Sequence, residues 1–302
     1  MSKVVCIGDA CVDIITRKGS NDFSYFNCGG ANANSSYALG KLNVDVSFVG
    51  MAGKDIYGQK MKEVLNEVNV NTELFLLDEI ESTKILIEID DNNDRFPRLL
   101  TTVNPSYLQI NEEQLNRIDL TNTEYILTNG MMLFDNPAAK SISDYLIRAH
   151  SKGIKIILDI NYRIETIDKD RKYLDKVIEI SDYLLGSLQD EILPISNKDN
   201  IEDAIKSLTI NNKTIIARYA KGADVYTKEE HFHSDSFKVE VKDTTGAGDA
   251  YNAGFIYGLV NNYTLDKCNR IGCACAAINI KKEGARNTPS IEELDLFMNQ
   301  YN

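Results

Sequence analysis

The chain has 302 residues, of which 43% are hydrophobic and 26% are charged, so it can bury a large core and has the composition of a globular protein. Its 33 basic and 45 acidic residues give a formal charge of −12, which argues against a nucleic-acid backbone or an anionic membrane as a general partner. Neither a signal peptide nor a bilayer-spanning apolar run is visible, and we expect a cytoplasmic protein.

The first predicted element is a strand. A β-branched run from Lys3 to Gly8 is typical of a buried strand in a parallel sheet. Asp9 and Asp13 follow at the carboxyl edge, where open α/β sheets bind ligands, and they either bind ligand hydroxyls or belong to a solvated loop. No dinucleotide-binding Gly-x-Gly-x-x-Gly motif follows, and Walker A is absent, so any ATP would have to be bound in another way.

A glycine turn then opens a helix, because Cys28-Gly29-Gly30-Ala31-Asn32-Ala33-Asn34 leads into the helical residues 35–42. By itself such a turn is more often a capped helix end than a binding site. A strand over Val46 to Val49 follows, and Asp55 is the expected N-cap of a helix from Tyr57 to Val68.

Two extended runs, residues 83–89 and 95–103, flank the polar residues 90–94 and predict a β-hairpin. From Glu124 onward strands alternate with amphipathic helices, which predicts a parallel sheet wound on both sides. No linker divides the chain, so we expect one domain over residues 1–302. Asp159, Asn161 and Arg163 end one of these strands, and a strand's period of two would point them the same way.

The stretch from Asp243 to Phe255 combines a small-residue turn with the start of a helix. The backbone N–H groups of Gly246, Ala247 and Gly248 would lie at the positive end of the helix dipole, which suits a phosphate. Asp249 in this turn either accepts a proton from an attacking hydroxyl or only complements the dipole.

The run Asp-Thr-Thr-Gly-Ala-Gly-Asp-Ala-Tyr-Asn-Ala-Gly-Phe closely resembles the C-terminal signature of the ribokinase-like (PfkB) family of carbohydrate kinases. The glycine turn at residues 28–34 and the block Gly50, Gly53, Asp55, Gly58 are similar to earlier motifs of that family. The resemblance implies a doubly wound, mostly parallel α/β sheet flanked by helices, with a small β-sheet lid formed by residues 14–28 and 83–103. It also implies transfer of the γ-phosphoryl of ATP, with Mg²⁺, to a hydroxyl of a small carbohydrate.

The resemblance further implies roles for particular residues. Asp249 would be the catalytic base, and Gly246, Ala247 and Gly248 would form the anion hole. The acceptor would be bound by Asp13, Gly29, Gly30, Asn34 and Arg163. ATP would be bound by Ser187, Arg218, Gly222, Gly246, Gly248 and Asn279. Asp243 and Thr245 would hold a monovalent cation such as potassium, if one is used.

Two stretches depart from the family pattern. Ser187-Leu188-Gln189-Asp190-Glu191 stands where the family has Asn-x-x-Glu, so the magnesium-linked acid is Asp190 or, with a slip of one residue, Glu191. Tyr219 replaces the first glycine of the turn that Gly222 closes, and tyrosine does not adopt positive φ as readily as glycine. The motifs therefore indicate phosphoryl transfer more clearly than they indicate which nucleotide is bound.

Several alternatives stay open. Fructose or 2-keto-3-deoxygluconate is favoured as the type of acceptor, followed by ribose and then a nucleoside. A non-catalytic regulator that binds sugar or nucleotide is the alternative of another class. An uncovered edge of the lid sheet would favour a homodimer. The six cysteines lack zinc spacings and indicate reduced, mostly buried thiols, and His231 and His233 have no apparent third metal ligand.

Overall fold

The structure is a computed structural model that describes residues 3–17, 25–89, 95–100, 104–161, 170–209 and 212–301. The strands are β1 (Val4–Ile7), β2 (Cys11–Arg17), β3 (Tyr25–Gly29), β4 (Val46–Gly53), β5 (Phe75–Asp78), β6 (Lys84–Ile89), β7 (Arg95–Leu99), β8 (Tyr125–Asn129), β9 (Lys155–Asp159), β10 (Tyr183–Ser187), β11 (Thr214–Tyr219), β12 (Gly222–Tyr226) and β13 (His231–Asp235). The helices are α1 (Ala31–Lys41), α2 (Ile56–Asn66), α3 (Glu112–Asn116), α4 (Ala139–Ser151), α5 (Lys172–Ile180), α6 (Leu193–Ser196), α7 (Ile201–Leu208), α8 (Ala247–Val260), α9 (Leu265–Asn279) and α10 (Ile291–Asn299).

The main sheet confirms the predicted α/β class. Its order within the described residues is β13-β12-β11-β10-β9-β8-β1-β4-β5, and the pairs from β5 to β11 are parallel, whereas β11, β12 and β13 are antiparallel. The chain winds from β1 to β4 on one side and continues at β8 on the other. The switch point therefore lies beside β1, where open α/β sheets place their ligand crevice.

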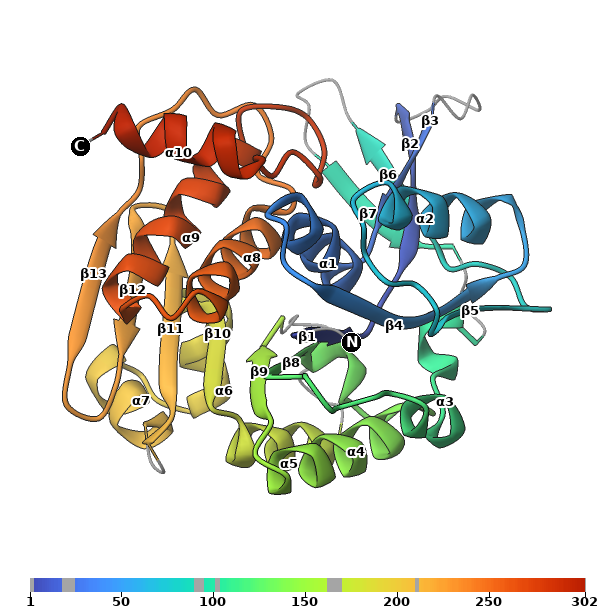
Figure 1. Cartoon of the computed structure of the whole chain (residues 1–302), viewed down its shortest axis with the longest axis horizontal. Helices are drawn as coiled ribbons and strands as arrows, with labels where there is room; N and C mark the ends of the chain where they lie inside the picture. The colour runs from blue at the N-terminus through green and yellow to red at the C-terminus, as the bar shows by residue number, and fades with distance from the viewer. Residues whose placement is uncertain are drawn as a thin grey trace.

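Helices cover both faces of the main sheet (Figure 1). Along β1, Val4 and Cys6 belong to the core under α1, α8 and α9, whereas Val5 and Ile7 belong to the core under α4 and α5. Alternate side chains of a strand point to opposite faces, so burial on both sides explains the uninterrupted apolar run in the sequence.

Helices α8 and α9 pack closely because small residues face each other. A Cβ atom on Gly254 would lie 2.8 Å from Cys275 Sγ, and one on Gly258 would lie 2.7 Å from Cys268 Sγ. These two cysteines are free and buried, as the sequence indicated, and they fill the space that the glycines leave. At Cys268 and Cys275 the small-residue pattern of α9 thus serves helix packing.

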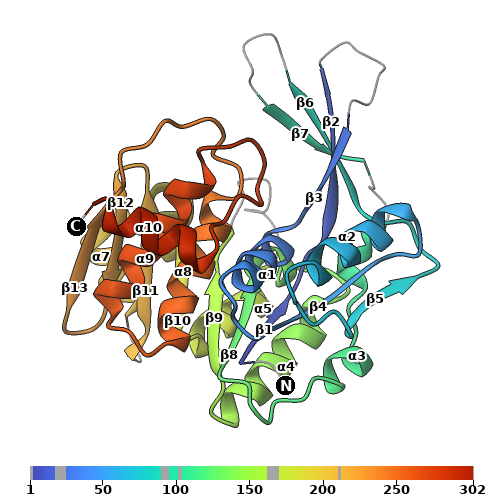
Figure 2. The ribbon, with the colours of Figure 1, turned by 45° about the horizontal axis from the view of Figure 1, so that its top comes forward.

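The second sheet has the order β3-β2-β6-β7 in the described part of the chain. Strands β6 and β7 form the predicted antiparallel hairpin, while β2 runs parallel to β6 and antiparallel to β3. Figure 2 shows this small sheet rising from the body of the molecule beside α2. Residues 18–24, 90–94 and 101–103 of the predicted lid lie outside the described residues. None of the helices in the described ranges is long and apolar enough to cross a membrane.

Candidate active site

The carboxyl ends of the parallel strands collect the polar residues of the site. Asp9 follows β1, while Asn129, Asp159 and Ser187 end β8, β9 and β10. The first turn of α8 lies against the same edge, because Asn252 of α8 donates from Nδ2 to Asp159 Oδ2 at 2.9 Å. Sequence segments more than 200 residues apart therefore meet here, as the contact between Asn34 and Asp249 shows.

Helix α8 begins at the glycine turn that the sequence singled out. Gly246 is its N-cap with φ 73°, and a Cβ atom there would lie 2.6 Å from Ala285 O, so this position requires glycine. The Ala247 N–H donates to Thr244 O at 3.1 Å, so one of the three predicted anion donors already has a protein partner. Gly248 lines the cavity described below.

Asp249 is half-buried in the first turn of α8 and has a strongly shifted pKa. Burial raises the pKa of this carboxyl from 3.8 to about 7, and the charges of Asp159 and Asp9 add to the rise. A hydrogen bond from Asn34 Nδ2, 3.0 Å from Asp249 Oδ2, opposes it. A carboxyl that titrates near neutrality can accept a proton from a substrate at physiological pH.

The acceptor residues predicted on α1 lie next to Asp249. Gly30 is the N-cap of α1 with φ 98°, and a Cβ atom there would lie 2.5 Å from Asp9 O. Asn34 is buried, and its two amide atoms contact Asp249 and Arg286. The tight turn thus brings the start of α1 against the start of α8.

Asp9 and Asp13 have different surroundings. The Asp9 carboxylate accepts the Ala31 N–H at 2.8 Å, the Asn32 N–H at 3.1 Å and Asn129 Nδ2 at 2.6 Å, so it caps α1. Asp13 lies half-buried on β2 in the small sheet. A Cβ atom on Gly29 would lie 2.8 Å from Asp13 Oδ2, so the predicted glycine leaves room for this carboxylate.

A cavity of about 540 Å³ lies on the other side of Asp249, a size that suits a nucleotide. Its apolar end is lined by Phe237, Val241, Ala276, Ala277 and Ile280, and its polar end by Asp159, Asn161, Ser187, Glu191, Arg218, Gly248 and Asp249. Strand β9 ends at Asp159 and Asn161 has φ 40°, so the predicted alternation does not continue past the strand. Arg163 lies outside the described residues.

Arg218 makes several contacts at the polar end of the cavity. Its terminal nitrogens lie 2.6 Å from Asp159 Oδ1, 2.6 Å from Asn252 Oδ1 and 3.1 Å from Gly248 O. Arg218 Nη2 also lies 3.6 Å from Glu191 Oε2. Arg218 thus holds the first turn of α8 against the strand ends. Sequence spacing indicated a nucleotide contact but not these protein partners.

The two candidate acids for magnesium, Asp190 and Glu191, lie in a turn that contains one extra residue. Leu188–Ile192 forms a π-helical turn, which inserts one residue relative to an α-helix. Glu191 consequently faces the cavity and accepts the Ser187 N–H at 2.5 Å, whereas Asp190 is exposed and accepts from Ser187 Oγ at 3.0 Å. Of the two registers, the one ending at Glu191 brings a carboxylate to the cavity.

Three other predicted residues tie the loop before α8 to the end of α9. Asn279 is fully buried, does not line the cavity, and donates to Thr245 O at 2.9 Å. The Asp243 carboxylate accepts the Thr245 N–H at 3.0 Å, the Thr245 hydroxyl at 2.7 Å and the Gly284 N–H at 2.7 Å. The observed contacts of these side chains are structural.

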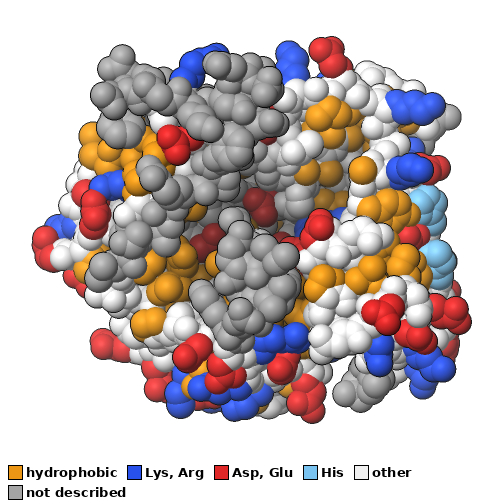
Figure 3. All heavy atoms as spheres, turned by 180° about the vertical axis from the view of Figure 1, so that it is seen from behind, with side chains coloured by type: hydrophobic (Ala, Val, Ile, Leu, Met, Phe, Trp, Pro, Cys, Tyr) orange, Lys and Arg blue, Asp and Glu red, His pale blue; other side chains and the backbone are white. Residues whose placement is uncertain are grey.

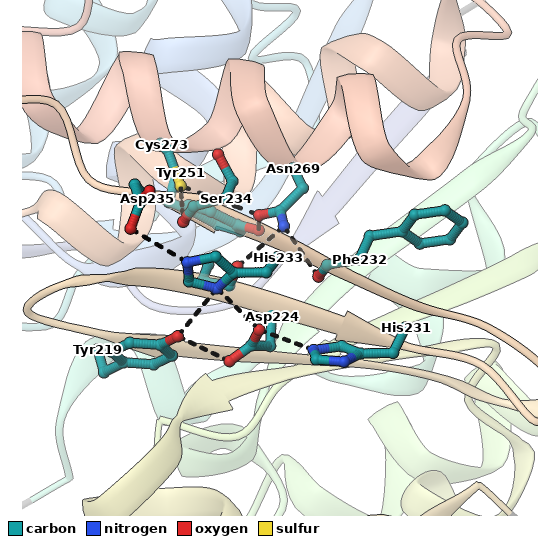
Figure 4. Close-up of polar contacts among 11 residues, drawn as sticks. Tyr219, Asp224, His231, Phe232, His233, Ser234, Asp235, Tyr251, Asn269 and Cys273 are labelled. Atoms are coloured by element: carbon teal, nitrogen blue, oxygen red, sulfur yellow. Dashed lines mark hydrogen bonds and ion pairs between the residues drawn. The ribbon is translucent and has the colours of Figure 1, made fainter.

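Tyr219 is the last residue of β11 and is not among the described residues of positive φ, so the conformation that favours glycine is not needed there. Its hydroxyl donates to Asp224 Oδ2 at 2.7 Å (Figure 4). Asp224 also contacts His231 Nε2 at 2.8 Å and His233 Nδ1 at 3.0 Å, so the two imidazoles lie on the same side of β13. Histidine side chains are visible at one edge of Figure 3. No group of three or more metal-ligating side chains suited to a metal occurs among the described residues.

Comparisons with known proteins agree with this fold. A 5-dehydro-2-deoxygluconokinase of Photobacterium profundum is 26% identical over 291 residues, covering 91% of this chain and 88% of the relative. The fructokinase of Xylella fastidiosa solved with bound ATP has a TM-score of 0.88 at 20% identity, covering 100% of this chain and 99% of that one. A Vibrio cholerae fructokinase double mutant solved with fructose, ADP and a potassium ion has a TM-score of 0.85 at 20% identity, with 98% of each chain covered.

The sequence profile described as pfkB family carbohydrate kinase matches residues 1–292, which include the strand ends, both glycine turns and Asp249. The chain belongs to the pfkB family of carbohydrate kinases.

Proposed function

We propose that this protein transfers the γ-phosphoryl of ATP to a hydroxyl of a small carbohydrate of the fructose or 2-keto-3-deoxygluconate type. The observation that carries the proposal is the position of Asp249, a half-buried carboxyl with a pKa of about 7. It lines the 540 Å³ cavity on one side and binds Asn34 of α1 on the other. A base between two binding regions suits direct transfer from donor to acceptor.

In the proposed mechanism Asp13, Gly29, Gly30 and Asn34 orient the acceptor so that its hydroxyl points at Asp249. Arg163 has the same proposed role. Asp249 accepts the hydroxyl proton as the hydroxyl oxygen attacks the γ-phosphorus. The bond from the γ-phosphorus to the bridging oxygen breaks, and ADP leaves. The start of α8, with Gly246 to Gly248, provides the positive end of a helix dipole for the transferred group. The small sheet would close over the acceptor and exclude water.

On the nucleotide side, we propose that the base occupies the apolar end between Phe237 and Ile280, with Ser187, Arg218 and Gly222 toward the phosphates. Asn279 supports this end of the site indirectly, through its hydrogen bond to Thr245 in the loop before α8. Magnesium is usually held by one or two carboxylates together with substrate phosphates. Of the cavity-facing carboxylates, Asp159 is already paired with Arg218 and Asn252, so we propose Glu191 as the ligand. Magnesium would neutralise charge on the phosphates during transfer. Asp190 is the alternative ligand from the sequence pattern, and its exposed side chain makes it the weaker choice.

The same proposal includes a bound potassium ion, a cytoplasmic location and a homodimer. The potassium ion in the Vibrio cholerae fructokinase structure supports a monovalent cation near Asp243 and Thr245, whose loop joins the anion hole. A homodimer would form through the small sheet, whose outer strands are β3 and β7 in the described part of the chain.

Relatives named 5-dehydro-2-deoxygluconokinase support a keto-sugar acid as acceptor, and the fructokinase neighbours support a ketose. Ribose and nucleosides are the runners-up. A non-catalytic regulator is the alternative of another class, and the raised pKa of Asp249 speaks against it, because a regulator has no use for a base that titrates near neutrality.

The test is ADP release from ATP and Mg²⁺ with fructose, 2-keto-3-deoxygluconate, ribose, inosine and adenosine, each with and without potassium. We expect one acceptor of the ketose or keto-acid class to exceed the hydrolysis background clearly. Turnover with a nucleoside alone would refute the acceptor class. Thermal stabilisation by ATP and a sugar without any turnover would favour the regulator.

A further inference from the structure

Arg286 is a partly buried cation that the proposed mechanism leaves unused. It lies between α9 and α10, and its Nε donates to Asn34 Oδ1 at 3.0 Å. Its terminal nitrogens Nη1 and Nη2 are shielded from solvent and have no hydrogen-bond partner. The family motifs identified in the sequence do not include this residue.

The loop that carries Arg286 is held in place before any ligand arrives. The Asn287 N–H donates to Asn279 Oδ1 at 2.9 Å, and Asn287 Nδ2 donates to Gly284 O at 2.7 Å. The Gly284 N–H donates to Asp243 Oδ2 at 2.7 Å. The guanidinium carbon lies 5.3 Å from the centroid of the Tyr37 ring, which supports one face of the group. Arg286 is therefore preorganised.

Arg286 is linked to the acceptor side of Asp249 through Asn34, whose amide contacts both residues. The ionisable groups that act on it are Cys28, Tyr37, Cys11 and Asp13, which belong to the small sheet and α1. Arg286 does not line the 540 Å³ nucleotide cavity, whose cation is Arg218. The two arginines thus have different partners, because Arg218 contacts β9 and α8 whereas Arg286 contacts α1.

Buried donors without acceptors are unfavourable, and more so when they belong to a charged group. Burial without a paired anion also lowers the pKa of Arg286. An oxyanion brought by a ligand would remove both penalties. The planar guanidinium presents parallel N–H bonds that match the two oxygens of a carboxylate.

We propose that Arg286 is a specificity-determining residue that binds the carboxylate of a sugar-acid acceptor through Nη1 and Nη2. This inference rests on the proposed kinase function and narrows its acceptor from ketoses and keto acids to acids. A sugar phosphate offers related oxyanion chemistry, but the nearby Asp13 carboxylate disfavours a dianion more than it disfavours a singly charged carboxylate.

Arg286 also supports Asn34, which in turn binds Asp249, so its removal can disturb the base for every acceptor. The informative quantity is therefore the ratio of kcat/KM for an acid to kcat/KM for a neutral sugar. A purely structural role would lower both values together. A carboxylate-binding role lowers the ratio, mainly through the KM for the acid.

The experiment measures kcat and KM of the full chain and of Arg286→Met and Arg286→Lys with 2-keto-3-deoxygluconate, fructose and fructose 1-phosphate. Arg148→Met is the control, because Arg148 is an exposed arginine on α4 that lies 3.6 Å from Glu112. We expect Arg286→Met to lower the acid-to-neutral ratio by about 10- to 100-fold, the range of one charge-assisted pair. Arg286→Lys keeps the positive charge but lacks the paired N–H groups of the guanidinium, so it should lower the acid-to-neutral ratio less.

Three results would overturn the inference: an unchanged ratio in both variants, a parent enzyme that prefers fructose to the acid, or a loss confined to fructose 1-phosphate. In each of them the kinase function itself stands. If no acceptor is phosphorylated, the proposed kinase function fails. The inference about Arg286 is then tested separately, by calorimetric measurement of 2-keto-3-deoxygluconate binding. Binding at least 10-fold weaker to Arg286→Met would then support the inference, and equal binding would overturn it.

Discussion

Replacing Asp249 with asparagine removes the proposed base while keeping its size and its place in α8. General-base catalysis contributes about 10²- to 10⁴-fold to rate, so we expect kcat to fall by that factor. The parent should show an acidic limb in its pH–rate profile near pH 7, because Asp249 must be ionised to accept a proton and its pKa is about 7. Steady-state ADP release between pH 5 and pH 9 measures both quantities.

The same substitution has a second consequence for stability. A carboxyl whose pKa rises from 3.8 to about 7 on folding opposes the folded state increasingly as pH rises through that interval. At about 1.4 kcal/mol per pKa unit, the penalty is about 2 kcal/mol at pH 5 and about 4 kcal/mol at pH 8. Asparagine does not ionise, so the variant should gain about 2 to 3 kcal/mol of unfolding free energy relative to the parent between these pH values.

Urea unfolding of parent and variant at pH 5 and pH 8 measures this gain. Asp266→Asn is the matched control, since Asp266 is an exposed acid in the first turn of α9. It should lose only about 0.3 to 1 kcal/mol through the helix dipole, equally at both pH values, and keep full turnover. Turnover of Asp249→Asn within tenfold of the parent, or a stability difference independent of pH, would refute the assignment of the base.

Three further substitutions, the last with a control, test the rest of the site. Asn34→Ala removes the hydrogen bond that lowers the pKa of Asp249, so the acidic limb of kcat/KM should move to higher pH; a shift to lower pH would contradict this. Arg218→Met leaves buried carboxylates without their cation and should lower the unfolding free energy by about 3 to 5 kcal/mol, as urea denaturation would show. Gly246→Ala and Gly153→Ala both replace glycines of positive φ, at a strain of about 1 to 2 kcal/mol, but only Gly246 has a crowded Cβ position, so only its variant should lose turnover.

Local patterns in the sequence predicted most of the secondary structure. The β-branched run after Lys3, the Asp55 N-cap of α2 and the glycine turn before α8 are all found where the residues indicated them. The hairpin of β6 and β7 is also confirmed. These features depend on residues within a few positions of one another, because strand burial, helix capping and turn geometry are determined locally. The parallel pairing of β2 with β6 had no such signal.

The partners of polar side chains were less predictable. The sequence left Asp9 as either a ligand-binding acid or part of a solvated loop, whereas its carboxylate in fact caps α1. The sequence left Asp190 and Glu191 as alternatives, and only the π-helical turn shows which one faces the cavity. A slip of one residue rotates a side chain by about 100° on a helix, so motif spacing alone does not determine the direction of an acid.

The sequence by itself determined the family, the strands and helices with clear periodicity, and Asp249 as the candidate base, because each rests on short motifs and local periodicity. Only the tertiary structure decided which charges are paired. Arg218 contacts Asp159 across 59 positions of the chain, and Arg286 contacts Asn34 across 252. Burial and the pKa of Asp249 follow from such long-range packing, since desolvation depends on everything that surrounds a group and not on its neighbours in sequence.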